Sequence, residues 1–182
     1  MNKRSIFIGV LFFSTFMISC KPNKSGEKSS TQEDNILTEQ ETSAGWKLLF
    51  DGKTLEGWRM YQNKAADAWG VKNGELYCKG SETDKSDLRA DIITTDQFEN
   101  YELSIDWKIS PEGNSGIMYH VTEEFEAAYL SGPEYQLIDD EGFPEKLEDW
   151  QKTASDYAMY TATSRPTNPV AQYNTSKIVV NG

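Results

Sequence analysis

The stretch that decides the fold runs from Tyr101 to Ile109 and reads YELSIDWKI. Its apolar side chains stand at every second position, and Glu, Ser, Asp and Lys fill the positions between them. Successive side chains of a β-strand point to opposite faces, so this alternation is typical of a strand with one buried face. We therefore predict a strand here that packs on a core and turns its polar face outward.

Shorter segments of the same kind flank this strand on both sides. We expect strands at 45–50, 69–78 as a hairpin, 88–95, 117–121, 134–139, 157–162 and 176–180. Asn73-Gly74 divides the hairpin and is a strong signal for a type I′ turn. Helical turns are expected only within 122–132 and near 146–151, because no long stretch has helical periodicity. Short strands punctuated by Gly, Asn and Pro predict an all-β fold, an antiparallel β-sandwich or jelly roll.

The composition disfavours several classes of protein. The 182 residues include 18 basic and 29 acidic side chains, which give a net charge of −11 and argue against a nucleic-acid binder. Two cysteines and one histidine are too few for a disulfide scaffold or a Cys/His zinc site. Aromatic residues make up 12% of the chain, which indicates a folded protein. Many aromatics in an acidic β protein also suit a carbohydrate-facing surface, although core packing alone would use them too.

The N-terminus has the features of an export signal. Lys3 and Arg4 precede an apolar stretch at 6–18, and Cys20 follows where cleavage is expected. This resembles a bacterial lipobox, so residues 1–20 are predicted to be a lipoprotein signal peptide with Cys20 lipidated; an ordinary signal peptide with a chance cysteine is the alternative. Residues 21–44 are polar and are predicted to be a flexible tether. These features predict a lipid-anchored protein of the bacterial cell envelope, on the periplasmic side or the outer membrane.

The other end of the chain carries an unpaired turn signal. A strand at 177–180 is followed directly by Asn181-Gly182, a strong hairpin signal, with no return arm after it. We therefore expect a chain cut in the middle of a hairpin, with a natural C-terminus as the alternative.

Six segments occur in the order found in a known family. They are GWKLLFDGKTLEGW, WGVKNGELYC, DQFENYELSIDWKI, NSGIMYH, GPEYQLIDDEG and YNTSKIVVNG. Together they resemble the 3-keto-disaccharide hydrolase domain over residues 45–182. The resemblance implies a concanavalin A-like jelly roll, secretion or lipid anchoring in bacteria, and a carbohydrate substrate that carries a ketone at C3 of a sugar ring. The family continues past Gly182 with further strands, so the resemblance also implies a domain that is incomplete at the C-terminus.

The motif that begins at Gly132 supplies the first candidate site residues. Glu134 and Gln136 are two residues apart on one predicted strand and therefore share a face. Glu134 could move a proton and Gln136 could bond sugar hydroxyls, whereas a solvated strand face is the plain alternative. Asp139 follows, either as a substrate ligand or as the cap of a turn. Asn114, in the NSGI motif, could bond substrate or only its own turn.

His120 is the remaining catalytic candidate. Its ordinary pKa, near 6.5, suits proton transfer. It is the chain's only histidine and ends the NSGIMYH segment, where many family members carry Arg. A structural hydrogen-bonding role is the alternative.

The activity that the resemblance implies needs a base, an acid and groups that stabilise an enolate. A ketone at C3 acidifies the hydrogen on C2, a base removes it, and the enolate expels the substituent on C1 before water adds. Glu134 and His120 are the candidates for base and acid, in either order. A divalent cation could stabilise the enolate, and Glu134 and Asp139 would then be its oxygen ligands.

Two other functions remain open from the sequence. A non-catalytic carbohydrate-binding lipoprotein could use the same jelly roll, since a fold does not settle a function. Convergence of Glu134, His120 and Asp139 in one groove would favour the enzyme, and a groove of aromatics alone would favour the binder. A conventional retaining glycosidase would need two carboxylates about 5–5.5 Å apart.

Overall fold

The computed structural model describes residues 7–9, 34–82 and 89–182. Within these residues the chain forms ten β-strands and one short α-helix, α1 (Glu39–Ser43). The strands are β1 (Phe7–Gly9), β2 (Trp46–Leu48), β3 (Trp58–Met60), β4 (Trp69–Lys72), β5 (Glu75–Cys78), β6 (Ile92–Thr94), β7 (Tyr101–Trp107), β8 (Asn114–Met118), β9 (Glu134–Ile138) and β10 (Asn174–Val180). Short 3₁₀ turns occupy Tyr61–Asn63, Lys79–Glu82, Ala128–Leu130 and Asp149–Gln151.

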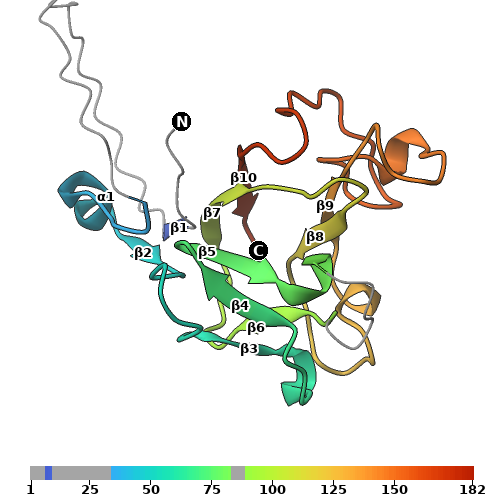
Figure 1. Cartoon of the computed structure of the whole chain (residues 1–182). Helices are drawn as coiled ribbons and strands as arrows, with labels where there is room; N and C mark the ends of the chain where they lie inside the picture. Colours follow the sequence, from blue (N-terminus) through green and yellow to red (C-terminus); the bar gives the residue numbers. More distant parts are fainter. Residues whose placement is uncertain (1–6, 10–33, 83–88) are drawn as a thin grey trace, which may run out of the picture.

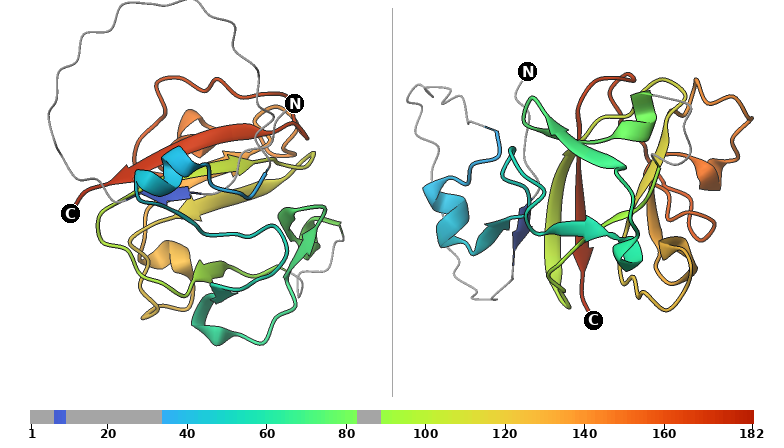
Figure 2. Two further views of the ribbon diagram at one scale, coloured as in Figure 1. Left: turned by 90° about the vertical axis from the view of Figure 1, so that its left-hand side faces the viewer. Right: turned by 60° about the horizontal axis from the view of Figure 1, so that its bottom comes forward.

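The strands form two layers. One is a four-stranded sheet in the order β10-β7-β1-β2, with all neighbours antiparallel. The other consists of three antiparallel pairs, β3–β6, β4–β5 and β8–β9. Residues of these pairs pack on the core that β7 and β10 build (Figures 1 and 2). The prediction of an all-β antiparallel sandwich is confirmed.

The core lies between the two layers. Phe50, Leu103 of β7, and Ile178 and Val180 of β10 form its buried centre. Residues from all three strand pairs pack against this centre, among them Trp58, Val71, Leu76, Ile117 and Tyr135. Burial of this apolar surface is the main force that holds the layers together.

A polar contact also bridges the layers. The Trp107 Nε1–H of β7 donates to the Ser176 hydroxyl of β10 at 2.7 Å, and the Tyr135 hydroxyl of β9 hydrogen-bonds with the same hydroxyl at 2.9 Å. Ser176 is 6% exposed, so its two partners satisfy a group that would otherwise be costly to bury. The bridge fixes β9, which carries the main candidate residue, relative to the opposite sheet.

Most of the predicted strands are present. The alternation at 101–109 gives β7, with Leu103 and Trp107 each 8% exposed. The 69–78 hairpin is confirmed as β4 and β5, and the φ values of Asn73 and Gly74, 55° and 76°, are those of the predicted turn. The helical turn expected within 122–132 is present at Ala128–Leu130.

Three predictions need correction. Residues 157–162 form no strand, because Ala158, with a φ of 61°, turns the chain back so that Asp156 bridges Tyr160. β8 begins at Asn114 instead of 117, because its turn-like first residues pair with β9. The end of the predicted tether folds: Thr38 and Glu41 form a capping box that starts α1.

The N-terminal predictions lie mostly outside the described residues. Cys20 and residues 21–33 are among those not described. Phe7–Gly9, within the predicted signal peptide, forms β1 between β2 and β7. None of the helices in the described part of the chain is long and apolar enough to cross a membrane.

Candidate active site

Glu134 begins β9, which is paired along both edges. On one edge the register places Met118 of β8 opposite Glu134. On the other edge the Tyr157 N–H donates to the Glu134 carbonyl at 2.9 Å, and the Gln136 N–H donates to the Ser155 carbonyl at 3.0 Å. Residues directly opposite each other in an antiparallel pairing share a face, so Met118, Glu134 and Tyr157 form one row across β8, β9 and the segment that pairs with the other edge of β9.

This row lies on the face of the layer that points away from the core. Tyr135, the next residue, packs on the core cluster, and alternation therefore turns Glu134 outward. On the same face, a Cβ added at Gly116 of β8 would overlap the Glu134 carboxylate. The space left by the missing side chain at Gly116 is therefore the space that the carboxylate occupies.

The electrostatic surroundings of Glu134 suit a proton acceptor. Its side chain is half-buried, and this burial raises the pKa of the carboxyl. The negative charge of Asp91 raises the same pKa further. Among the described residues none donates a hydrogen bond to the carboxylate, so no protein donor competes with a ligand for it. Such a carboxylate is a stronger base than an exposed one.

The sequence pattern alone does not identify Asp91 as a site residue. It directly precedes β6, and its carbonyl accepts a hydrogen bond from the Tyr61 N–H at 3.0 Å. Its side chain is exposed, which leaves it open to a ligand. The sequence shows only that Asp91 is an acidic residue inside the β-rich stretch 88–95. It does not show which distant strand this residue faces.

An ion pair fastens the loop after β8 to the strand beside Asp91. The Arg59 guanidinium of β3 donates two hydrogen bonds of 2.6 Å to the Glu123 carboxylate. Hydrogen bonds from Arg59 and from the Gln62 N–H lower the pKa of Glu123 to about 2. The Tyr61 hydroxyl also bonds the carbonyls of Thr122 and Phe125. These contacts hold the 122–125 loop in place.

Gln136 and Asp139 are buried, and their side chains bond backbone groups of the protein instead of facing a substrate. Gln136 shares the face of Glu134 as predicted, but it is 2% exposed and its Oε1 accepts from the Leu137 N–H, which corrects the expectation of a hydroxyl-binding amide. Asp139 is 8% exposed, and its carboxylate accepts from the backbone N–H groups of Glu112 and Gly142 at 2.9 Å each. These bonds lower the pKa of Asp139 and favour the turn-capping alternative.

His120 and Asn114 are exposed at the two ends of the β8 region. His120 follows β8 with a φ of 55°, and its ring lies 5.9 Å from that of Tyr119. Asn114 starts β8 opposite Ile138, on the face that also carries Glu134. No hydrogen bond joins either side chain to Glu134 within the described residues. Their roles as acid or base and as substrate ligand stay predictions.

The carboxylates do not fit a shared cation. Glu134 and Asp139 are five residues apart along one strand, which corresponds to roughly 16 Å. Asp139 is already bonded by backbone N–H groups. In the described ranges no group of three or more His, Cys, Asp or Glu side chains could hold a metal ion. The expected pairing of Glu134 and Asp139 on one divalent cation is therefore not supported.

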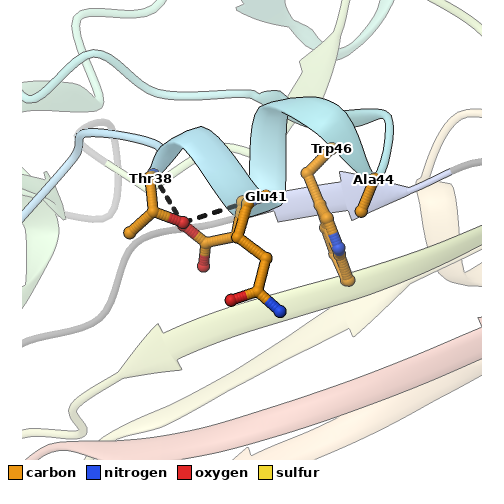
Figure 3. A pocket seen from close by; sticks show the side chains of 5 residues that line it. Thr38, Glu41, Ala44 and Trp46 are labelled. Carbon is orange, nitrogen blue, oxygen red and sulfur yellow. Dashed lines mark hydrogen bonds between the residues drawn. The ribbon is translucent and has the colours of Figure 1, made fainter.

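A shallow hollow of about 370 Å³ lies elsewhere, between α1 and β2. Figure 3 shows Thr38, Glu41, Ala44 and Trp46 around it. α1 and β2 lie at the opposite end of the molecule from β8 and β9 (Figures 1 and 2). This hollow is therefore separate from Glu134.

Comparison with known proteins finds a curated bacterial relative. A 3-keto-disaccharide hydrolase of Bacteroides thetaiotaomicron is 35% identical over 153 residues, which cover 75% of this chain and 52% of that protein. The chain thus spans about half the length of this curated relative.

Two solved structures from Parabacteroides distasonis, both provisionally assigned as glycosyl hydrolases, share the fold. One has a TM-score of 0.72 at 40% identity and covers 80% of this chain and 68% of that one. The other has a TM-score of 0.52 at 21% identity, with coverages of 67% and 62%, and supports the fold alone. The model of the 3-keto-alpha-glucoside-1,2-lyase-like domain matches residues 45–182, and the chain belongs to that family.

Proposed function

We propose that this protein cleaves glycosides that carry a ketone at C3 of the sugar ring. Membership of the family and the name of the Bacteroides relative support this substrate class. The observation that carries the proposal is Glu134, a half-buried carboxylate with a raised pKa that overlies Gly116 on the outward face of β9. Such a group suits the removal of a carbon-bound proton.

The reaction proceeds in two stages. Glu134 takes the proton from C2 of the keto sugar, the electron pair forms an enolate with the C3 carbonyl, and the C1–O bond then breaks as a C1–C2 double bond forms. The leaving oxygen takes up one proton, which balances the proton taken from C2. Water then adds its hydroxyl to C1 and a proton returns to C2, so the net change is addition of one water across the glycosidic bond.

In this scheme Asp91 adjusts the pKa of the base Glu134, so replacing Asp91 should change the pH profile of the reaction in a predictable direction. Its negative charge raises the pKa of Glu134. In Asp91→Asn this contribution disappears, the pKa of Glu134 falls, and the base stays ionised to lower pH. The acidic limb of kcat/KM is therefore expected to move to lower pH.

The control for this prediction is Asp96→Asn, the same change in an exposed residue that pairs with Lys47. Asp96→Asn should leave the acidic limb of the kcat/KM pH profile unchanged. A limb that stays in place or moves to higher pH in Asp91→Asn would contradict the assignment of Glu134 as the titrating base.

The substrate class is tested by a matched pair of disaccharides. The protein in its full natural length is incubated with a disaccharide of two glucose units and with the same disaccharide oxidised at C3 of one ring. We expect cleavage of the oxidised disaccharide alone. Equal cleavage of both would indicate a conventional glycosidase, in which Glu134 and Asp91 would act as a carboxylate pair.

A carbohydrate-binding role without catalysis is the second candidate. Exposed aromatic side chains favour it, since Trp150, Tyr129 and Tyr160 are 38%, 63% and 71% exposed. In addition, the Asp139 carboxylate is bonded by backbone N–H groups and does not join Glu134 in one site. Binding of both disaccharides with cleavage of neither would support this second candidate.

Lipid anchoring through Cys20 remains part of the proposal. The charged start, the apolar stretch and Cys20 support a membrane-attached protein of the bacterial envelope. Cys20→Ala is expected to release the protein from the membrane fraction or to block its maturation. An unlipidated N-terminus in the wild-type protein, measured by mass spectrometry, would refute the anchor.

A further inference from the structure

The segment that pairs with β9 at Glu134 carries an aromatic pair, Tyr157 and Trp150. Tyr157 is opposite Glu134 in the edge pairing, with its N–H bonded to the Glu134 carbonyl at 2.9 Å. The Trp150 ring lies 5.3 Å from the Tyr157 ring with an interplanar angle of 72°, an edge-to-face arrangement. Trp150 is still 38% exposed, so packing on Tyr157 leaves part of the indole open to solvent.

The segment that carries this pair is fixed at several points. The Thr153 hydroxyl donates to the Ile138 carbonyl at 2.8 Å, and the Ser155 hydroxyl donates to the Asp149 carbonyl at 3.1 Å. Thr153 and Ser155 are 1% and 0% exposed. Lys152 and Arg165 both pair with the Asp149 carboxylate, at 3.2 and 3.3 Å. A segment held in this way presents the exposed indole as a fixed surface. Figure 1 shows the backbone of this segment to the right of β9.

The position of the Trp150 ring relative to Glu134 determines which sugar unit of the substrate can bind on it. The ring that loses its C2 proton must lie directly at the Glu134 carboxylate. Tyr157 is one strand spacing away, about 4.8 Å. The Trp150 ring lies 5.3 Å from that of Tyr157, and Trp150 approaches β9 through this ring contact. A platform that is reached through Tyr157 suits the neighbouring unit of the substrate, because the reacting ring must lie at Glu134.

We propose that Trp150, supported by Tyr157, is the stacking platform for the leaving-group sugar of a 3-keto disaccharide. The C–H groups of a pyranose ring form an apolar face, and burying that face on an exposed indole is favourable. The inference rests on the proposed function, since it names the subsite next to Glu134. It makes the protein selective for a sugar over a small alcohol as the leaving group.

The test compares two substrates that share the reacting ring. One is a 3-keto α-glucosyl-glucose disaccharide, and the other is methyl 3-keto-α-glucoside, whose leaving group is too small to reach Trp150. In Trp150→Ala, KM for the disaccharide is expected to rise roughly tenfold, with KM for the methyl glycoside unchanged. Trp150→Phe keeps an aromatic face and should restore most of the preference.

The control is Phe125→Ala, which removes an aromatic side chain that is 46% exposed on a different loop. It should leave the ratio of kcat/KM for the two substrates unchanged. Equal losses on both substrates in Trp150→Ala would show that Trp150 only supports β9, and would overturn the subsite. Failure of the wild-type protein to cleave either substrate would instead refute the proposed function, and the subsite with it.

Discussion

Replacing Glu134 by Gln is expected to lower kcat on a 3-keto glycoside by roughly 10²–10⁴-fold, the usual contribution of a general base. The amide keeps the shape of the side chain but cannot accept the C2 proton. Because the interaction is made with the reacting proton, the loss should appear in kcat with a modest change in KM. The measurement is steady-state kinetics on the full-length natural protein.

Glu99→Gln, the same change at an exposed position before β7, is the matched control and should behave as wild type. A loss confined to KM would mean that Glu134 binds hydroxyls without moving a proton. A wild-type kcat in Glu134→Gln would remove Glu134 from the chemistry and transfer the role of base to His120.

The raised pKa of Glu134 also gives this variant a signature in stability. Burial and Asp91 favour the protonated carboxyl in the folded state. The folded protein therefore binds this proton more tightly than the unfolded chain, and the associated stability is lost as pH rises through the folded-state pKa. At neutral pH the charged Glu134 opposes folding, so Glu134→Gln should unfold at a temperature no lower than wild type. An inactive variant that is equally stable has lost chemistry and not structure.

The sequence predicted the parts of the fold that alternate over several residues. β7 has seven residues, and its two most buried apolar side chains, Leu103 and Trp107, were on the predicted face. β3 was missed because its three residues, Trp58–Met60, are too few to show a period. Its pairing with β6, far along the chain, creates the strand.

The alternation of side chains along a strand predicted which candidate site residues share a face, but not which distant residues approach them. Parity correctly placed Glu134 and Gln136 on one face. It could not reveal that the chain after β9 returns along the same strand and buries Gln136, with Ser155 bonded to its N–H. Nor could it bring Asp91 to Glu134, because that approach depends on how β6 and β9 are placed around a common core. Local pattern determines the face, and the contacts between distant strands determine the site.

Gly116→Ala should reduce activity by about 100-fold while the protein stays folded, because misplacing a catalytic group by about 1 Å can cost that much. The new Cβ would take the space of the Glu134 carboxylate, and this flexible side chain must swing away. Gly116 does not have a positive φ, so its strand conformation is open to Ala.

The defining measurement is a double-mutant cycle with Glu134→Gln. If Gly116 acts only through the position of Glu134, Gly116→Ala should cost almost nothing further in the Glu134→Gln background, a strong departure from additivity. Ser115→Ala, at the neighbouring exposed position of β8, should retain wild-type activity. Additive losses in the cycle would mean that Gly116 matters for another reason, such as close approach of the substrate to the β8 backbone. Non-additive losses would link the missing side chain of one strand to the reactivity of a carboxylate on the next.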